Sequence, residues 1–454
     1  MKKIIVLIGA VTALLLAVSP LLMGLIISDS RTETTLRELT GQTGLKLQME
    51  SSWFTSQGRV TVTAPVIAGV TYDDITLVAD VTVAHGPLLL TNTGLRPGIA
   101  WAHLTPIITG LPADHPLQQL FADGTTSTVT VLAGLTGALQ LALHAASPTF
   151  TLPAAQYNLT EPTTMTLQDL QASLALARNG AADLYVSSNE VQVRNSLYVA
   201  TATQATLHAH STELSATPLP GSLHIAAQQL QIDDVPGAVV STSAITGSLT
   251  MHGISIDYAA RQQADTQTIT LEQTLDVARI EASLPLESLN MHTELTGIDE
   301  ALATEYLTFL RETQSTMQAM TAPQLQEHIA EHSETLALHL LQAPMQQTST
   351  LKLQAWGGAH EATLDMRWPG MPSLTSLEQI DADTMLQMLV VTLEIAASAE
   401  TVATSPLAAA AQAYTTQGLL IEDNGKIVLK ASLQDGNLDL NGNSFPLGPF
   451  LNFR

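Results

Sequence analysis

Alternation of apolar and polar residues dominates the chain and predicts β-strands. Between residues 59 and 298, Val, Ile, Leu and Ala repeatedly take every second position, with Thr or an acidic residue between them. A period of two with Val and Thr enrichment is typical of strands that bury one face. Turn-prone pairs such as Asp123-Gly124, Asn179-Gly180 and Pro236-Gly237 separate several of these runs. The pattern predicts an antiparallel meander over residues 51–298.

The period becomes helical at Asp299, a plausible N-cap residue. The first helix extends to residue 320 and places a set of apolar side chains near one face: Leu302, Tyr306, Phe309, Leu310, Met317 and Met320. The run Thr321-Ala322-Pro323-Gln324 resembles a capping box and begins a second helix, which ends near Leu341. We therefore expect a helical hairpin over residues 299–345.

Strand texture resumes over residues 346–454, with short helices expected near residues 376–386 and 405–418. A final strand pair is expected at 426–433 and 437–440, joined by Asp435-Gly436. The predicted class is α+β, mainly antiparallel β: a large, curved and twisted sheet with the helical hairpin as an insert. Helices are too few to cover all of its apolar face, so the sheet either leaves an apolar groove or folds on itself around a filled core.

The N-terminal stretch Ile4–Ile27 contains no charged residue and follows Lys2 and Lys3. A helix of this length spans roughly 36 Å, enough to cross a hydrocarbon core of about 30 Å. A cleavable signal peptide is the alternative, but the nearest cleavage pattern, Ala17-Val18-Ser19, is followed by Pro20 and more apolar residues. We expect a single-pass anchor at residues 1–27, a stalk at 28–50, and the remaining chain outside the cytoplasm.

Composition excludes several classes of function. The formal net charge of −24 disfavours nucleic acid and anionic lipid headgroups as partners. The chain has no Cys, which excludes disulfides, thiolate metal sites and Cys nucleophiles. No phosphate-binding loop, dinucleotide fingerprint, nucleophile elbow or EF-hand loop occurs, so no cofactor is expected.

One five-residue stretch has the spacing of a zinc site. His328 and His332 stand four residues apart with Glu331 between them, as in inverted zincins. His332 falls, however, on the apolar stripe that explains this helix, which consists of Leu325, Ile329, Leu336 and Leu340. Short motifs of this kind often match by chance. We interpret the histidines as structural or surface residues and expect no catalytic residue and no metal ligand.

Three further histidines lie in predicted strands. His208 and His210 alternate on one face, and His224 stands on a neighbouring run. They could bind a transition metal. A solvated or hydrogen-bonded surface pair is the interpretation that we favour.

Several short motifs resemble one family. Ser51-Ser52-Trp53-Phe54-Thr55-Ser56, His85-Gly86-Pro87-Leu88, Gly418-Leu419-Leu420 and the run from Asp435 to Gly442 are similar to elements of the YdgA-like bacterial proteins of unknown function. The resemblance implies a bacterial inner-membrane anchor, a periplasmic body and no established catalytic residue. Ser51-Ser52 departs from the usual arginine-glycine of the family. The positions that carry the resemblance are Trp53, Phe54, His85, Gly86, Pro87, Asp435, Gly436, Asn441 and Gly442.

These motif residues also have structural interpretations. Trp53 and Phe54 are expected in the core, because large rings stabilise most where they are buried. His85-Gly86-Pro87 is expected to end a strand.

Three functions fit the sequence. The first is a non-enzymatic envelope protein whose β surface binds an apolar or lipidic ligand. The second is a scaffold or assembly factor for other envelope proteins, which requires an exposed patch rather than a cavity. The third is a zinc hydrolase that uses His328, Glu331 and His332. Fold-level analogy cannot decide among them.

Overall fold

The computed structural model describes fifteen segments of the chain, and everything below refers to these segments. They are residues 44–52, 54–63, 66–67, 70–71, 76–91, 94–109, 116–121, 127–152, 161–212, 221–234, 248–263, 267–282, 286–316, 333–377 and 382–446. The predicted anchor at Ile4–Ile27 lies outside them. Among the helices that the structure describes, none has the length and apolar character needed to span a membrane.

The chain divides into two compact units, Met1–His210 with Ile232–Ser241, and Ser211–Gln231 with Thr242–Arg454. Each is described by itself. The first unit contains β1 Leu45–Ser51, β2 Thr55–Thr63, β3 Val66–Ile67, β4 Val70–Thr71, β5 Thr76–His85, β6 Leu88–Thr91, β7 Gly94–Pro97, β8 Ala100–Thr109, α3 Pro116–Leu120, β9 Ser127–Ala133, β10 Leu139–Ala145, β11 Thr149–Leu152, β12 Thr163–Gln168, β13 Leu170–Leu176, β14 Ala182–Arg194 and most of β15 Tyr198–Ser211.

The main sheet of the first unit is antiparallel throughout, in the order β1-β2-β5-β8-β9-β10-β13-β14. Strands β11 and β12 pair with each other, and β12 also pairs with β14. A small hairpin of β6 and β7 stands apart from this ladder. Residues 45–50, which were expected in the stalk, belong to a strand, because they pair along their whole length with β2.

The second unit contains most of β16 Gly221–Asp234, then β17 Leu249–Gln263, β18 Thr268–Glu281, β19 Leu286–Asp299, α4 Glu300–Thr316, a helix at 333–342, β20 Met345–Ala355, β21 Gly358–Trp368, α6 Ala382–Met388, β22 Val390–Ser398, α7 Ala399–Thr404, α8 Ala408–Thr416, β23 Ile421–Asp423, β24 Lys426–Gln434, β25 Asn437–Leu440 and β26 Asn443–Pro446.

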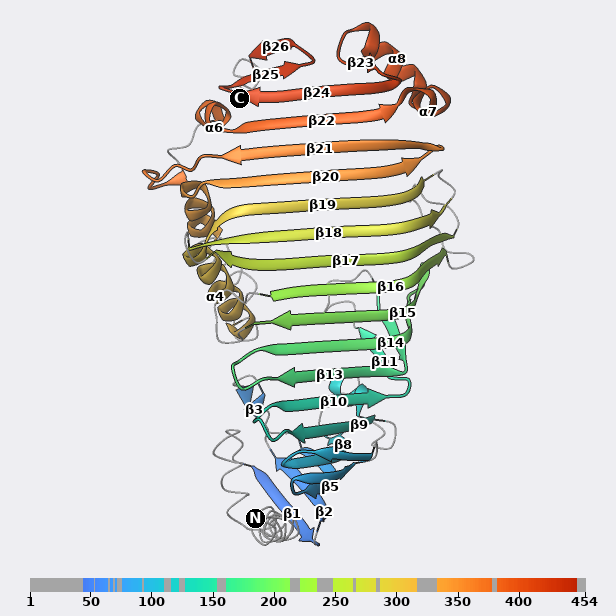
Figure 1. The fold of residues 1–454 in the computed structure, drawn as a ribbon, viewed down its shortest axis with the longest axis vertical. Coiled ribbons are helices and arrows are strands. Elements are labelled where there is room, and N and C mark those ends of the chain that lie inside the picture. Colours follow the sequence, from blue (N-terminus) through green and yellow to red (C-terminus); the bar gives the residue numbers. More distant parts are fainter. Residues whose placement is uncertain are drawn as a thin grey trace, which may run out of the picture. The chain divides into compact units, whose positions relative to one another are not determined.

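Its sheet is a meander in which β17, β18, β19, β20, β21, β22, β24, β25 and β26 pair successively and antiparallel (Figure 1). The mainly antiparallel class that the sequence predicted is confirmed. Register places apolar residues on one face, in rows such as Leu275, Met291, Leu351, Ala362 and Ile395. Charged residues take the other face, where Lys430 lies 3.7 Å from Glu394 and Arg261 lies 2.7 Å from Glu272.

Two-residue turns with positive φ at both positions close four hairpins of this unit. They are Trp356-Gly357, Asn424-Gly425, Asp435-Gly436 and Asn441-Gly442. Asn-Gly and Asp-Gly favour this geometry because both residue pairs tolerate left-handed backbone, and its twist matches that of the strands. The Asp435-Gly436 connection expected from the sequence is confirmed.

The helical hairpin begins where it was expected. Asp299 ends β19, and its Oδ1 accepts the backbone N–H of Ala301 at 2.7 Å and that of Leu302 at 3.4 Å. It therefore caps α4. The second helix covers residues 333–342 in the described part. Two helices, α3 and α7, were not expected; Ser398 caps α7 through a bond from the N–H of Thr401 at 3.4 Å.

Replacing the cap should weaken the hairpin. We expect Asp299→Ala to lower the free energy of unfolding of the second unit by about 1 kcal/mol, because two N–H groups lose their acceptor. Asp299→Ser keeps a side-chain acceptor and is the matched control. Urea denaturation followed by circular dichroism measures the difference. Equal midpoints for Asp299→Ala and the parent protein would show that the cap is not needed.

Candidate functional site

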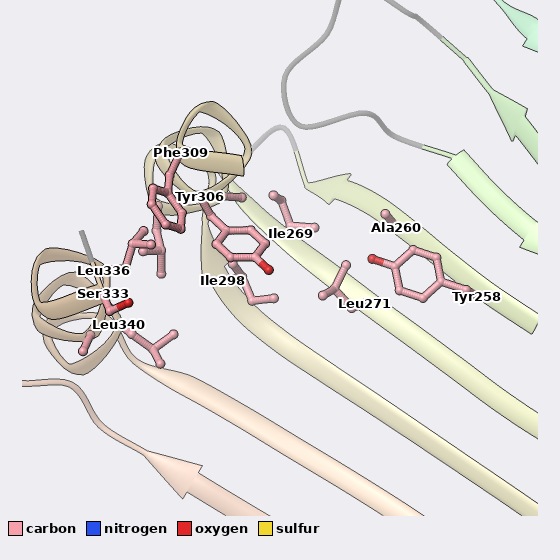
Figure 2. A pocket seen from close by; sticks show the side chains of 13 residues that line it. Tyr258, Ala260, Ile269, Leu271, Ile298, Tyr306, Phe309, Ser333, Leu336 and Leu340 are labelled. Carbon is pink, nitrogen blue, oxygen red and sulfur yellow. The ribbon is translucent and has the colours of Figure 1, made fainter. Parts of the chain in front are cut away.

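An apolar cavity of about 600 Å³ lies between the sheet of the second unit and the two helices (Figure 2). Its walls come from strands β17, β18 and β19 on one side, and from α4 and the helix at 333–342 on the other. The thirteen lining residues are Tyr258, Ala260, Ile269, Leu271, Ile298, Leu302, Ala303, Tyr306, Phe309, Ser333, Leu336, Ala337 and Leu340.

None of these lining side chains carries a charge. Ile269 and Leu302 are buried at the back of the cavity, with 3% and 8% of their surface exposed. Tyr258, Tyr306 and Leu340 are exposed at its rim. A largely apolar cavity of several hundred cubic ångströms with few polar groups is the usual form of a small-ligand site.

Two tyrosine hydroxyls supply most of the polarity. Figure 2 shows the hydroxyl groups of Tyr258, from β17, and Tyr306, from α4, pointing toward one another across the cavity. Partial burial raises the pKa of Tyr258 above its usual value, because desolvation disfavours the phenolate. Tyr258 therefore remains a protonated hydrogen-bond donor at neutral pH.

A polar contact joins α4 to the helix at 333–342. His339 Nδ1 lies 2.6 Å from Glu305 Oε2. Both side chains are partly exposed, so the pair is worth little as a stability term. The pair links the two helices that form one side of the cavity.

Sequence reasoning predicted part of this site. Leu302, Tyr306 and Phe309 share one face of α4 as expected, and Leu336 and Leu340 of the predicted stripe line the cavity from the helix at 333–342. The strand residues were missed. Register alone places Ala260 opposite Leu271 and brings both beneath the helices. A period of two indicates that a strand has an apolar face, but not which neighbour completes it.

The family-like motif around His85 forms a buried turn after β5 and does not line a cleft among the described residues. His85 ends β5, as expected, and is 1% exposed. Its Nε2 lies 3.3 Å from the buried Ser56 Oγ, and its backbone N–H donates to the carbonyl of Phe54 at 3.0 Å. Gly86, at φ 117°, donates to the carbonyl of Ile99 at 3.1 Å, which turns the chain toward the β6–β7 hairpin. Pro87 accepts from the N–H of Gly98 at 3.3 Å.

The core placement predicted for Phe54 is wrong. Its side chain is 53% exposed, because the residue lies in the turn between β1 and β2 and contributes its carbonyl to His85. Trp53 lies outside the described residues.

The second family-like motif, which ends at Asn441 and Gly442, holds the C-terminal strands together through hydrogen bonds. Asn441 Oδ1 accepts the N–H of Lys430, and Asn441 Nδ2 donates to the carbonyl of Leu419, both at 2.8 Å. Its own N–H donates to the carbonyl of Lys430 at 2.8 Å. With φ at 49°, Asn441 occupies backbone space that suits Asn and Gly. Gly442 completes the turn.

The candidate zinc residues His328, Glu331 and His332 lie outside the described residues. The strand histidines are surface residues with acidic partners that the sequence did not reveal. His210 Nδ1 lies 2.7 Å, and His208 Nε2 3.6 Å, from Asp183 Oδ1. His224 Nδ1 lies 2.6 Å from Asp257 Oδ1. Within the described segments, no group of three or more His, Cys, Asp or Glu residues could hold a metal.

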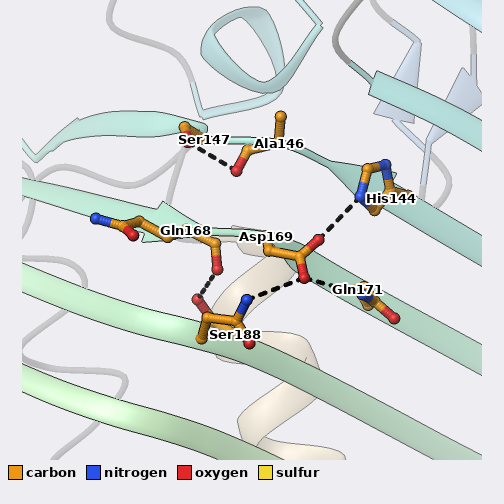
Figure 3. A network of polar contacts seen from close by, with 8 residues as sticks. His144, Ala146, Ser147, Gln168, Asp169, Gln171 and Ser188 are labelled. Carbon is orange, nitrogen blue, oxygen red and sulfur yellow. Dashed lines mark hydrogen bonds and ion pairs between the residues drawn. The ribbon is translucent and has the colours of Figure 1, made fainter.

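A polar network marks the break between β12 and β13 (Figure 3). Asp169 takes a positive φ of 52° there, and its carboxylate accepts from Gln171 at 3.2 Å and Asn189 at 3.1 Å. His144 Nε2 lies 3.0 Å from the other oxygen. Ser188 Oγ donates to the carbonyl of Gln168 at 2.8 Å. The hydrogen bond with His144, followed by that from Gln171, lowers the pKa of Asp169.

Comparison with known proteins identifies the family of this chain, and the function of that family is unknown. The model of a family described as "Bacterial protein of unknown function (DUF945)" matches residues 1–448. No curated protein matches the chain.

The side-chain hydrogen bonds of Asn441 should contribute to the free energy of unfolding. We expect Asn441→Ala to lower the free energy of unfolding by about 2 to 4 kcal/mol, since two hydrogen bonds and the preference for left-handed backbone are lost together. Asn437→Ala removes one exposed bond to the Asp435 carbonyl and should cost below about 1 kcal/mol. Denaturant titration measures both. If Asn441→Ala lowers the free energy of unfolding no more than Asn437→Ala does, Asn441 does not hold the C-terminal strands together.

The carboxylate of Asp169 should make stability depend on acid pH. Its folded pKa lies below the unfolded reference of 3.8, so its contribution is present above that value and is lost as pH falls through the folded pKa. Asp169→Asn lacks this titration. We expect the parent protein's advantage over Asp169→Asn to shrink below pH 3.8 in denaturant titrations. A constant difference from pH 6 to pH 2 would refute the assignment.

Proposed function

Because the chain belongs to the bacterial DUF945 family, whose function is unknown, we propose a function from the cavity itself: binding of a lipid acyl chain. The protein is proposed to be a non-enzymatic envelope protein of the YdgA-like type. Its uncharged stretch Ile4–Ile27 would anchor it in the bacterial inner membrane, with the body in the periplasm. The absence of charge among the thirteen cavity residues is the observation that carries the ligand assignment.

Burial of methylene groups supplies the binding energy. Each methylene removed from water contributes about 0.8 kcal/mol, and micromolar affinity corresponds to about 8.2 kcal/mol. About ten buried methylenes therefore reach that value before the costs of association are subtracted. A cavity of about 600 Å³ lies in the middle of the range that holds drug-sized molecules.

The lining also specifies which part of a lipid enters. A charged headgroup would lose hydration without gaining a partner, since none of the described residues that line the cavity is charged. The hydroxyls of Tyr258 and Tyr306 can donate to an ester or another neutral acceptor. The acyl chain is thus proposed to lie inside and the headgroup at the rim.

The rest of the sheet supports the same assignment. Apolar side chains of β18 to β22, such as Leu275, Leu351 and Leu393, are only partly buried, although they lie in the middle of strands. A face of this kind offers a continuation of the cavity to a longer chain. A scaffold for other envelope proteins is the alternative, and a concave, uncharged site favours it less than a flat exposed patch would.

Photo-crosslinking in cells tests the proposal on the full chain. Leu336 is replaced by p-benzoylphenylalanine, and the irradiated protein is purified and weighed by intact mass spectrometry. We expect an adduct with the mass of a membrane lipid. Ala303→Trp, which fills the cavity from α4, should reduce that adduct at least fivefold.

The control places the same photoreactive residue at Tyr414, exposed on α8 and away from the cavity lining. It should give no lipid adduct. A protein adduct at position 336 would favour the scaffold function. Equal lipid adducts at positions 336 and 414, or none at 336 in folded protein, would refute the acyl-chain site.

A further inference from the structure

A second cleft lies on the polar face of the first unit, across five strands. Register aligns one residue from each strand in a row: His103 of β8, Thr130 of β9, Ala142 of β10, Ser173 of β13 and Tyr185 of β14. Neighbouring strands lie about 4.8 Å apart, so the four steps of this row span about 19 Å. Small side chains in the middle and rings at both ends leave a trough along the row.

The trough consists of two adjoining pockets, with volumes of about 480 and 290 Å³. Arg96, Trp101, Thr130, Ala142 and Ser173 line both of them, so they form one cleft. All of its lining residues belong to the first unit. The cavity proposed for the acyl chain belongs to the second unit and shares no residue with it.

Aromatic rings form the ends of the cleft. Trp101 stacks on His103, with ring centres 5.9 Å apart and planes 16° from parallel. At the far end Tyr185, which is 45% exposed, meets His208 edge-on at 6.4 Å. The faces of such rings carry partial negative charge and suit the C–H groups of a saccharide ring. These two ends are too far apart to sandwich one planar base.

The floor and one side of the cleft carry hydrogen-bonding groups. Thr128, Thr130, Gln171 and Ser173 contribute hydroxyl and amide side chains, which can both donate and accept. Gln171 and His144 are held by the Asp169 carboxylate, at 3.2 and 3.0 Å. This arrangement fixes the two side chains before any ligand binds, which lowers the entropic cost of binding.

One cation faces the cleft at the Trp101 end. Arg96 of β7 is exposed and forms no ion pair with any residue that the structure describes. The backbone fixes the end of its hairpin, because Ile99 N donates to the carbonyl of Ala133 at 2.8 Å. In a chain with 41 acidic and 17 basic residues, an arginine that has no carboxylate partner among the described residues is available to an external anion.

From these observations we infer that the cleft binds a saccharide that carries an acidic group, either a carboxylate or a phosphate. The sugar rings stack on Trp101 and Tyr185, and their hydroxyls bond to the side chains of the floor. The acidic group pairs with Arg96. The carboxylates of Asp169 and Asp183 lie toward the His144 and His208 side, so the acidic end of the ligand takes the Arg96 end of the cleft.

Isothermal titration of the full-length protein tests this assignment. The protein is kept in a detergent without a sugar headgroup, so that the detergent does not compete. The probes are a trimer of galacturonic acid, glucose 6-phosphate, maltotriose, inorganic phosphate and adenosine monophosphate. We expect the acidic sugars to bind at least tenfold more tightly than maltotriose, and inorganic phosphate and the nucleotide more weakly than either acidic sugar.

Three variants separate the contributions. Arg96→Gln should reduce affinity for the acidic sugars at least tenfold and leave that for maltotriose unchanged. Tyr185→Ala should weaken both kinds of sugar about tenfold, whereas Tyr185→Phe should keep the binding. Arg178→Gln, in the turn between β13 and β14, is the matched arginine control and should change nothing. Thermal unfolding verifies that each variant is folded.

Several results would overturn the inference. They are absence of binding at millimolar concentration, binding of phosphate as tight as that of glucose 6-phosphate, tighter binding of the nucleotide, or acidic-sugar affinity unaffected by Arg96→Gln. None of these results bears on the acyl-chain cavity, which is read separately by photo-crosslinking at position 336. Failure of the two proposals can therefore be told apart.

Discussion

Backbone pairing between antiparallel strands is the constraint from which the rest of this structure follows. Once β17 to β24 are paired in their observed registers, every second side chain must point to the same face. The chain places Leu, Ile, Val and Met on one of these faces and charged residues on the other. A sheet with one apolar face requires a cover, and among the described residues α4 and the helix at 333–342 cover part of it, over β17, β18 and β19. The cavity is the space that this partial cover leaves.

Periodicity predicted most of the elements, because the signal lies within each segment. Strands such as β18, β20 and β24, the cap at Asp299, the hairpin helices and the Asp435-Gly436 turn were visible in local sequence. Features that depend on cross-strand register were not. The acidic partner of His210, the floor beneath Tyr306 and the row from His103 to Tyr185 are set by which strands pair. Strand β1 was taken for a stalk because its partner β2 could not be identified from the sequence.

The family-like motifs and the candidate sites occupy different parts of the molecule. His85 and Gly86 turn the chain after β5, and Asn441 fastens β24 to the segment after α8. Residues of this kind are restricted by backbone geometry, so they leave short and recognisable sequence signatures. The residues that line the two cavities need only the right size and polarity. Ala303 or Leu336 could be exchanged for other apolar residues without leaving a visible trace in the sequence.

The successive pairing of the second unit also limits how such a chain can change in length. Each strand from β18 to β21 contacts its two neighbours along the chain, so the sheet is close to one-dimensional, like a repeat protein. Insertion of the segment between β19 and β20 leaves their pairing intact, since loop closure costs grow only slowly with length. Loss or gain of a single strand would reverse the direction of everything that follows. Growth by whole hairpins avoids this reversal, so the apolar face can lengthen only in steps of two strands.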